Sequence, residues 1–249
     1  RLSYLTKRIL QQNQNNQDFT SLIKIMNMNT YYKGEPKHLV SVDCIVLGFE
    51  NKKLQLLVGK RKVEPYSGKL SLYGGFVRED ESLKEAANRV LFQCTGINDI
   101  YMRQVGAFGE TDRDPGDRVI SIAYCALINV SDYDQKLLEE NDLQWVDINE
   151  LPELYGDHIE MVQIALAQLR KLINKDPLGF NLLPELFTLT QLQNVHEAIL
   201  GVEIDKRNFR KRIKQIDFIE KTELIDKITS KRGAALYRIN KEIYNEASL

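Results

Sequence analysis

The sequence predicts an α/β domain followed by a small helix-rich domain, and three observations support this division. Strand-like apolar runs alternate with segments of helical periodicity from residue 31 to residue 173. The segment NKDPLGFNLLP at residues 174–184 then holds two prolines and a glycine, a composition typical of a linker. Two short helical segments follow it. We therefore expect domains at residues 31–173 and 185–249, preceded by a loose polar arm at residues 1–30.

The strands of the first domain are predicted from runs rich in β-branched and aromatic residues. Leu39–Phe49 and Leu54–Arg61 flank the turn Glu50–Lys53 and so predict a hairpin. Similar runs predict further strands at Tyr101–Phe108, Val119–Val130 and Leu143–Val146. Apolar residues recur at helical spacing in Ser82–Cys94 and Asp157–Ile173. Together these elements make an α/β unit.

The second domain opens with a well-marked helix, Thr188–Leu200. Thr188 and Gln191 have the spacing of a capping box at its start. The tetrapeptide Gly201–Ile204 separates it from a second helix, Asp205–Asp217, as in a helix-turn-helix. Two predicted strands, Phe218–Thr222 and Ala234–Ile239, then surround the basic tip Lys231–Gly233. This order of elements predicts a winged helix.

The overall composition is globular, with 43% apolar and 28% charged residues. It excludes a disordered polymer, a collagen-like fibre and a coiled coil over most of the chain. No window approaches about 18 uninterrupted apolar residues, and the N-terminus lacks the apolar segment of a secretory signal. We expect a cytoplasmic protein with no membrane partner.

Cysteine and histidine spacing gives no support to a metal site or a disulfide framework. Cys44, Cys94 and Cys125 lie far apart in or beside apolar segments. The three histidines, His38, His158 and His196, are equally scattered. We expect reduced thiols and no metal or other cofactor.

The second helix of the winged helix is strongly basic. Residues 205–214 read DKRNFRKRIK, a local charge of +5 from six cations and one aspartate. Such a helix is often only a solvated face, but second in a helix-turn-helix it predicts DNA contact. Arg207 and Asn208 are the candidates for base readout, and Arg212 for an internal ion pair. The candidate phosphate contacts are Lys206, Arg210, Lys211, Lys214, Lys231 and Arg232.

The segment Gly74–Ile97 reads GGFVREDESLKEAANRVLFQCTGI and resembles the Nudix box. In that motif a glycine is followed at fixed spacings by a glutamate, an Arg-Glu-apolar-x-Glu-Glu run and a final glycine with an apolar residue. The resemblance implies a Nudix-type α/β/α sandwich with a mixed sheet. The positions that match in register are Gly75, Glu81, Arg89, Leu91, Gly96 and Ile97.

The three glutamates that hold metal in the Nudix family are missing, because Val90, Gln93 and Cys94 stand in their places. Magnesium binds hard anionic oxygens, which neither a valine nor a thiol supplies. Glu81 and Glu85 leave a weaker metal site as an alternative. Otherwise Glu81 favours the helix N-terminus electrostatically and Glu85 is a solvated helix residue. We expect a catalytically inactive Nudix domain.

Longer stretches, Arg103–Ile128, Phe187–Thr222 and Lys231–Ile239, resemble Nudix-related transcriptional regulators. These bacterial proteins join a degenerate Nudix sensor to a winged helix. Within residues 31–244 the sequence is most similar to the arabinose-responsive repressors of sugar utilisation, and less similar to regulators of NAD synthesis that sense ADP-ribose. The resemblance implies a dimeric repressor whose Nudix domain binds a small effector and releases operator DNA.

The candidate effector-binding residues are polar or aromatic side chains near the predicted strand ends. Asp43 lies in an apolar strand, where a carboxylate is rare without a partner, and is read as ligand-facing or as structural. Tyr73 precedes the double glycine. A solvated loop or a contact with a partner subunit would also explain the charges of residues 110–118. The candidates besides Asp43 and Tyr73 are Lys60, Arg61, Arg113, Asp114 and Arg118.

The expected function is a ligand-responsive DNA-binding regulator rather than an enzyme. We expect a homodimeric repressor of arabinose or related pentose utilisation that leaves double-stranded operator DNA when a small sugar binds. ADP-ribose is the less favoured effector. The alternative is an active Nudix hydrolase of ADP-ribose-like nucleoside diphosphates, against which the missing glutamates argue.

Overall fold

The computed structural model describes residues 32–62, 64, 66–97, 100–130, 135–173, 178–228, 232–240 and 242–243. The chain divides into two units, Arg1–His38 and Leu39–Leu249. The predicted arm, residues 1–30, lies outside the described residues. The second unit holds the predicted domain at residues 185–249 and all but residues 31–38 of the domain predicted at residues 31–173. Within the described residues, no helix is long and apolar enough to cross a membrane.

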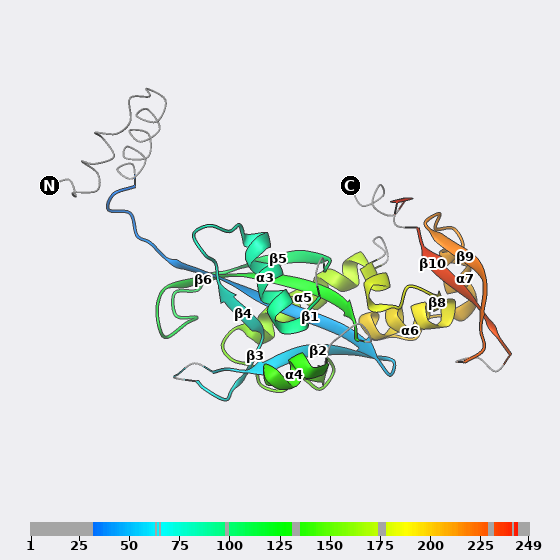
Figure 1. Cartoon of the computed structure of the whole chain (residues 1–249), viewed down its shortest axis with the longest axis horizontal. Coiled ribbons are helices and arrows are strands. Elements are labelled where there is room, and N and C mark those ends of the chain that lie inside the picture. Colours follow the sequence, from blue (N-terminus) through cyan, green and yellow to red (C-terminus); the bar gives the residue numbers. More distant parts are fainter. Residues whose placement is uncertain are drawn as a thin grey trace, which may run out of the picture. The chain divides into compact units, whose positions relative to one another are not determined.

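A seven-stranded mixed sheet forms the centre of the first domain (Figure 1). Its main path runs β3-β2-β1-β6-β5, with β4 paired to β1 and β7 paired to β2. β1 and β6 are parallel and the other pairs are antiparallel. The strands are β1 Leu39–Glu50, β2 Lys53–Lys60, β3 Leu70–Ser71, β4 Tyr73–Phe76, β5 Met102–Phe108, β6 Val119–Asn129 and β7 Leu143–Asp147.

The predicted hairpin between β1 and β2 is confirmed. Glu50 pairs with Lys53, and the turn between them has Asn51 and Lys52 at φ 51° and 62°. Two positive φ angles in a two-residue loop are typical of a type I′ turn, whose twist matches that of the strands.

Helices cover both faces of this sheet, so the predicted α/β/α sandwich is confirmed. Helix α3 (Leu83–Thr95) packs on the side to which Val42, Cys44 and Val46 of β1 point. Helix α5 (His158–Leu172) packs on the side of Ile45 and Leu47. Alternate residues of β1 thus serve two separate cores, as the two-residue repeat of a strand requires. A short helix, α4 (Gln135–Glu140), precedes β7.

The second domain is a winged helix, as predicted. Its helices are α6 (Leu189–Leu200) and α7 (Lys206–Ile213), and the capping box of Thr188 and Gln191 is present. Strands β8 (Phe187–Thr188), β9 (Ile219–Asp226) and β10 (Ala234–Ile239) form a sheet in the order β8-β10-β9. The second helix was predicted to reach Asp217, but α7 ends at Ile213.

Part of the predicted linker is folded. Residues Leu178–Leu182 form a 3-10 helix, η2, and Leu182 is 1% exposed. One apolar core cluster contains Leu127 and Met161 of the first domain together with Leu192 and Phe209 of the winged helix. The two domains therefore share buried apolar surface. The proposed boundary at residues 174–184 stays a prediction, and residues 174–177 lie outside the described part of the chain.

Candidate effector pocket and DNA-binding face

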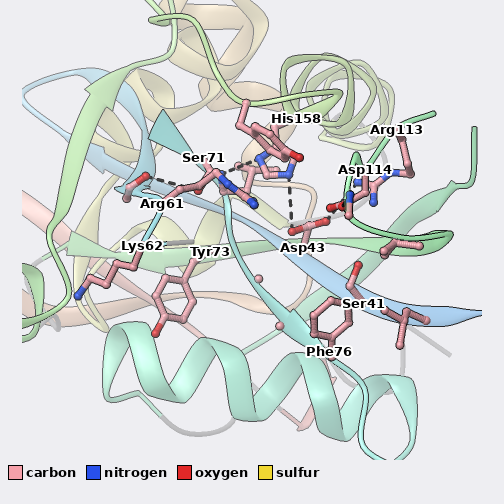
Figure 2. Close-up of a pocket in the computed structure, with 18 of the residues that line it drawn as sticks. Ser41, Asp43, Arg61, Lys62, Ser71, Tyr73, Phe76, Arg113, Asp114 and His158 are labelled. Atoms are coloured by element: carbon pink, nitrogen blue, oxygen red, sulfur yellow. Dashed lines mark hydrogen bonds and ion pairs between the residues drawn. The ribbon is translucent and has the colours of Figure 1, made fainter. Parts of the chain in front are cut away.

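A pocket of about 680 Å³ opens where β1, the end of β2 and β4 meet the loop at residues 113–119 and the start of α5. Figure 2 shows the side chains of His158 and Arg113 pointing toward Asp43 from these elements. Six of the seven predicted effector residues line it: Asp43, Lys60, Arg61, Tyr73, Arg113 and Asp114. Their role in effector binding stays a prediction.

Arg118 is the exception among the predicted residues. It is absent from the pocket lining, and its guanidinium donates a hydrogen bond to the Glu110 carbonyl at 2.9 Å. Within the same loop, Arg113 thus points into the pocket, whereas Arg118 hydrogen-bonds to the backbone of the loop itself. Sequence reasoning also missed pocket residues that only the fold brings in, namely Ser41, Ser71, Phe76, Tyr155 and His158.

The backbone of β1 and β4 decides which way Asp43 faces. Asp43 lies on the same face of β1 as Ile45 and Leu47, and it is paired with Gly74 of β4. A Cβ atom at Gly74 would collide with the Asp43 carboxylate and with the Val42 carbonyl. The first glycine of the double glycine is therefore needed so that a carboxylate can occupy this position.

Asp43 is the centre of a buried polar network. The residue is 8% exposed, and its Oδ2 accepts a hydrogen bond from the Ser121 hydroxyl. Arg113 Nη2 lies 3.7 Å from Asp43 Oδ2 and binds Asp157 in a bidentate ion pair at 2.8 and 2.9 Å. Burial disfavours the charged guanidinium, but Asp157 and Asp43 together raise the pKa of Arg113. The Arg113 guanidinium therefore stays charged between the two carboxylates.

His158 completes this network in its neutral form. The Leu72 backbone N–H donates a hydrogen bond to His158 Nδ1 at 3.0 Å, so the ring proton resides on Nε2. His158 Nε2 lies 3.8 Å from Asp43 Oδ1. Burial lowers the pKa of His158, although the nearby Asp43 opposes this shift. The imidazole thus presents an N–H donor beside a carboxylate.

At one end of the pocket, an arginine packs against aromatic rings. The Arg61 guanidinium lies 3.9 Å from the centroid of the Tyr155 ring, a cation–π contact. The Tyr155 ring packs edge-on against His158, with 5.6 Å between the ring centroids. It also packs against the Tyr66 ring in a tilted arrangement, with 5.4 Å between the centroids. Arg61 is thereby held in one orientation at the end of β2.

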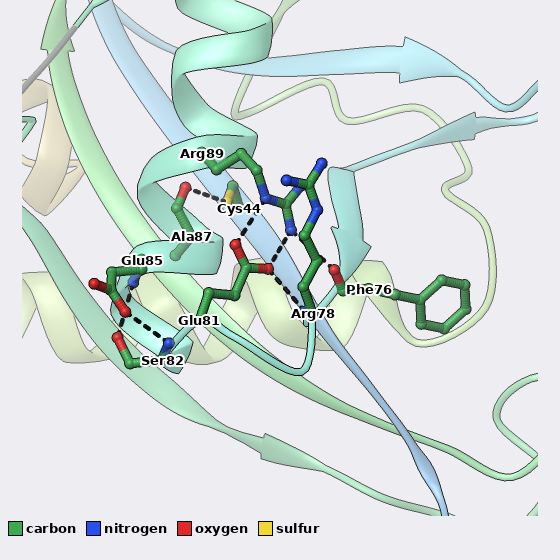
Figure 3. A network of polar contacts seen from close by, with 8 residues as sticks. All are labelled: Cys44, Phe76, Arg78, Glu81, Ser82, Glu85, Ala87 and Arg89. Carbon is green, nitrogen blue, oxygen red and sulfur yellow. Dashed lines mark hydrogen bonds and ion pairs between the residues drawn. The ribbon is translucent and has the colours of Figure 1, made fainter. Parts of the chain in front are cut away.

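The Nudix-like helix has a structural role. Arg89 binds Glu81 with Nε at 2.9 Å and also donates to the Phe76 carbonyl at 2.9 Å (Figure 3). The Arg89 side chain lowers the pKa of Glu81 to about 2. Glu85 is exposed, as the sequence suggested, and it also closes a capping box with Ser82. Both glutamates have protein partners that hold the loop-to-helix junction.

The positions of the missing glutamates do not resemble a metal site. Val90 is 1% exposed and Cys94 is fully buried, both within the apolar core beneath α3. Burial raises the pKa of Cys94 to about 12, so its thiol stays protonated. Gln93 points to solvent. Among the described residues, no group of three or more His, Cys, Asp or Glu side chains is placed to hold a metal ion.

The winged helix presents its basic residues outward. Phe209 and Ile213 bury one side of α7, and Asp205 caps its start by accepting a hydrogen bond from the Asn208 N–H at 2.8 Å. Arg212 lies against buried groups, with its guanidinium 3.5 Å from His196 Nδ1 and 5.5 Å from the Phe209 ring. Lys231 lies outside the described residues. The predicted DNA contacts that are exposed are Lys206, Arg207, Asn208, Arg210, Lys211, Lys214 and Arg232.

Comparison with known proteins agrees with this architecture. Residues 37–164 match the NUDIX domain family, and residues 179–239 match the NrtR DNA-binding winged helix domain. A protein of Acinetobacter baylyi named ADPR responsive transcriptional repressor NtrR is 35% identical over 220 residues, which cover 86% of this chain and 88% of that protein. The chain belongs to the NrtR family of Nudix-type regulators.

Solved structures show the same NrtR fold. The crystal structure of Shewanella oneidensis NrtR in complex with a 27mer DNA has a TM-score of 0.76 and 28% identity, and the match covers 83% of this chain and 95% of that one. The Nudix half alone is similar to an ADP-ribose pyrophosphatase of Methanocaldococcus jannaschii, with 32% identity over 50% of this chain and 70% of that enzyme. None of these relatives supports the expected arabinose effector.

Proposed function

We propose that this NrtR-family chain is a transcriptional repressor whose operator binding is weakened by ADP-ribose. The observation that carries the proposal is the pocket itself. It keeps a buried carboxylate, two arginines and aromatic rings, whereas the helix that would hold catalytic metals is apolar at two of the three glutamate positions. Such a pocket suits binding of a charged sugar nucleotide without its hydrolysis. The Acinetobacter relative, which is named for its response to ADPR, supports this choice of effector.

The pocket is large enough for this effector. Its volume of about 680 Å³ lies within the range of about 300–1,000 Å³ that is usual for small-molecule sites. The cations at the end of β2, which are Lys60, Arg61 and Lys62, suit a diphosphate. Lys62 also lies 3.3 Å from Asp142, but a free pentose would offer no anionic group to Lys60 and Arg61. ADP-ribose therefore replaces arabinose as the proposed effector.

DNA binding is proposed for the exposed face of α7 and for the wing. Arg207 and Asn208 lie in the first turn of α7, where a recognition helix reaches base edges. The other exposed cations are proposed to contact phosphates and to position the helix. Since helix-turn-helix proteins commonly read paired half-sites, we also propose a homodimer, which light scattering with and without DNA would test.

Helix α5 supplies a route between the two sites. Its first residue, His158, and its N-cap, Asp157, belong to the pocket network. In its last turn, Arg170 Nε donates a hydrogen bond to the Ile199 carbonyl of α6 at 2.9 Å. Ile199 lies two residues before the Gly201 turn that leads to α7. A small shift of α5 on effector binding would thus reach the DNA-binding helices.

The test uses the full chain and a fluorescent duplex selected by binding from a random-sequence pool. ADP-ribose is expected to weaken duplex binding by about 5–150-fold, which corresponds to a coupling of about 1–3 kcal/mol. Arabinose is expected to leave binding unchanged. Coupling is reciprocal, so the duplex must weaken ADP-ribose binding by the same factor. Release by arabinose but not by ADP-ribose would overturn the effector assignment.

The second candidate, an ADP-ribose hydrolase, rests on the similarity to the Methanocaldococcus enzyme. We infer that turnover is absent, because Val90 and Cys94 are buried where the family places carboxylates. Incubation of the chain with ADP-ribose and Mg²⁺ or Mn²⁺ is expected to yield no AMP. Turnover of about 1 per second or faster would establish the hydrolase instead.

A further inference from the structure

The pocket contains polar atoms that the protein leaves only partly paired. Asp43 lies 3.8 Å from His158 Nε2 and 3.7 Å from Arg113 Nη2. Both distances are too long for a hydrogen bond, yet one oxygen atom can bridge each of them. Among the described residues, the Tyr155 hydroxyl and Arg61 Nε are buried without any hydrogen-bond partner. Buried polar atoms without a partner are rare in native proteins and call for a ligand or a water.

The Asp43 end of the pocket has the chemistry to bind two neighbouring hydroxyl groups. A hydroxyl donates one hydrogen bond and accepts others. The two oxygens of the Asp43 carboxylate can accept from both hydroxyls, while His158 Nε2–H and Arg113 can each donate to one of them. Proteins that bind dinucleotides use an acidic side chain on ribose hydroxyls in the same way. A cis-diol would therefore fill both gaps around Asp43.

The Arg61 end has the chemistry to bind a phosphate. Arg61 is fixed on the Tyr155 ring, and its Nε lacks a partner. A planar guanidinium suits phosphate oxygens, and the Tyr155 hydroxyl can donate to the same group. Lys60 and Lys62 add positive charge beside it. Tyr155 contacts both His158 and Arg61, so the two ends are separated by the width of one aromatic ring.

We propose that the pocket recognises a ribose 5-phosphate unit, with the cis-diol on Asp43, His158 and Arg113 and the phosphate on Arg61 and Tyr155. This inference rests on the proposed ADP-ribose response and specifies how that effector is recognised. ADP-ribose contains two such units, one on each side of its diphosphate. The shared chemistry is a ribose whose 2′ and 3′ hydroxyls are free.

The experiment measures, by calorimetry on the full chain, two pairs of ligands that differ by one hydroxyl group. Ribose 5-phosphate is compared with 2-deoxyribose 5-phosphate, and ADP with 2′-deoxy-ADP. The pair that carries the recognised ribose is expected to lose about 10–100-fold in affinity without the hydroxyl, since hydrogen bonds to charged groups are the strong ones. The first pair reports the terminal ribose and the second the adenosine ribose. Equal affinity within both pairs overturns the proposal.

Variants give an independent readout with ADP-ribose as the ligand. Asp43→Asn and Arg61→Met are each expected to weaken binding by about 10–100-fold. Asp112→Asn, an exposed carboxylate of the loop beside the pocket, is the matched control and is expected to bind normally. Unfolding curves without ligand check that each variant is folded. If a variant is not folded, the affinities of the wild-type chain for the two ligand pairs test the proposal instead.

The outcomes separate this inference from the proposed function. If wild-type chain binds ADP-ribose and releases DNA while Asp43→Asn and Arg61→Met bind it equally well, the recognition mode is wrong and the repressor function stands. If the wild-type chain binds no ADP-ribose at all, the proposed function itself fails.

Discussion

The two faces of strand β1 have opposite characters. On the α3 face, Val42, Cys44 and Val46 are fully buried in an apolar core that also contains Val90. On the α5 face, Asp43 lies in a network with Arg113 and His158. The helix that carries catalytic carboxylates in Nudix hydrolases is thus reduced to a support, while the opposite face keeps its polar groups. Under the proposed function, ligand binding and metal chemistry therefore occupy separable parts of this fold.

The largest effect is expected from returning a charge to the apolar face. Val90→Glu would place a carboxylate without a partner in a position that is 1% exposed. We expect a loss of about 3 kcal/mol or more in the free energy of unfolding, measured with urea. Gln93→Glu, on the exposed side of the same helix, is the control and should stay within about 0.5 kcal/mol of wild type. A loss of less than about 1 kcal/mol in the free energy of unfolding for Val90→Glu would show that water reaches this face.

The next effect concerns the connection of the α5 face to the DNA-binding domain. Arg170→Met removes the hydrogen bond to the Ile199 carbonyl but keeps the length of the side chain. We expect ADP-ribose to bind with little change, and its effect on duplex binding to fall from about 5–150-fold toward none. Lys171→Met, an exposed neighbour, is the control. Undiminished release in the Arg170 variant would contradict the proposed route through α5.

A smaller effect, which depends on pH, is expected from the histidine of the α5 face. Burial lowers the pKa of His158 below its ordinary value of 6.5, so the unfolded chain takes up a proton before the folded chain does. This contribution to stability is complete above about pH 6.5 and decreases as the pH falls. We expect His158→Gln to make the decline between pH 7.5 and 5.5 shallower in urea unfolding. His196→Gln, in the winged helix, provides the comparison, because burial lowers the pKa of His196 to about 4.

The smallest effect belongs to the partly exposed ion pair of the Nudix-like loop. Arg89 lowers the pKa of Glu81 from 4.5 to about 2. The stabilisation is therefore present above about pH 4.5 and is lost as the pH falls toward 2. Thermal unfolding of Glu81→Gln is expected to depend less on pH in this range than that of wild type. An unchanged acid dependence would mean that the pair contributes nothing measurable.

The regular elements could be predicted from the sequence because their periodicity is local. Strand Ala234–Ile239 was predicted at its observed bounds, and the helix at Asp157–Ile173 differs by one residue at each end. The short strand Tyr73–Phe76 was missed, since its double glycine has no strand pattern and its pairing with β1 depends on tertiary structure. A strand that depends on pairing with a distant partner cannot be predicted from its own residues.

The candidate pocket was predictable where the sequence itself carried a signal. Asp43 is a carboxylate within an apolar strand, and the other predicted lining residues lie near strand ends or in a charged loop. His158 and Tyr155 carry no such signal, because a histidine or tyrosine at a helix start is ordinary in sequence and its proximity to residue 43 is set by the fold. The opposite directions of Arg113 and Arg118 within one loop have no sequence signal either.

The apolar cluster that continues from Leu127 and Met161 into Leu192 and Phe209 limits how such a regulator can be rebuilt. A chimera that joins this winged helix to a different sensor through a flexible linker would expose side chains that are now buried. The new sensor domain of such a chimera would need an apolar surface complementary to that of the winged helix. The shared core thus makes the two domains one folding unit, in which substitutions of pocket side chains disturb less buried surface than an exchange of domains would.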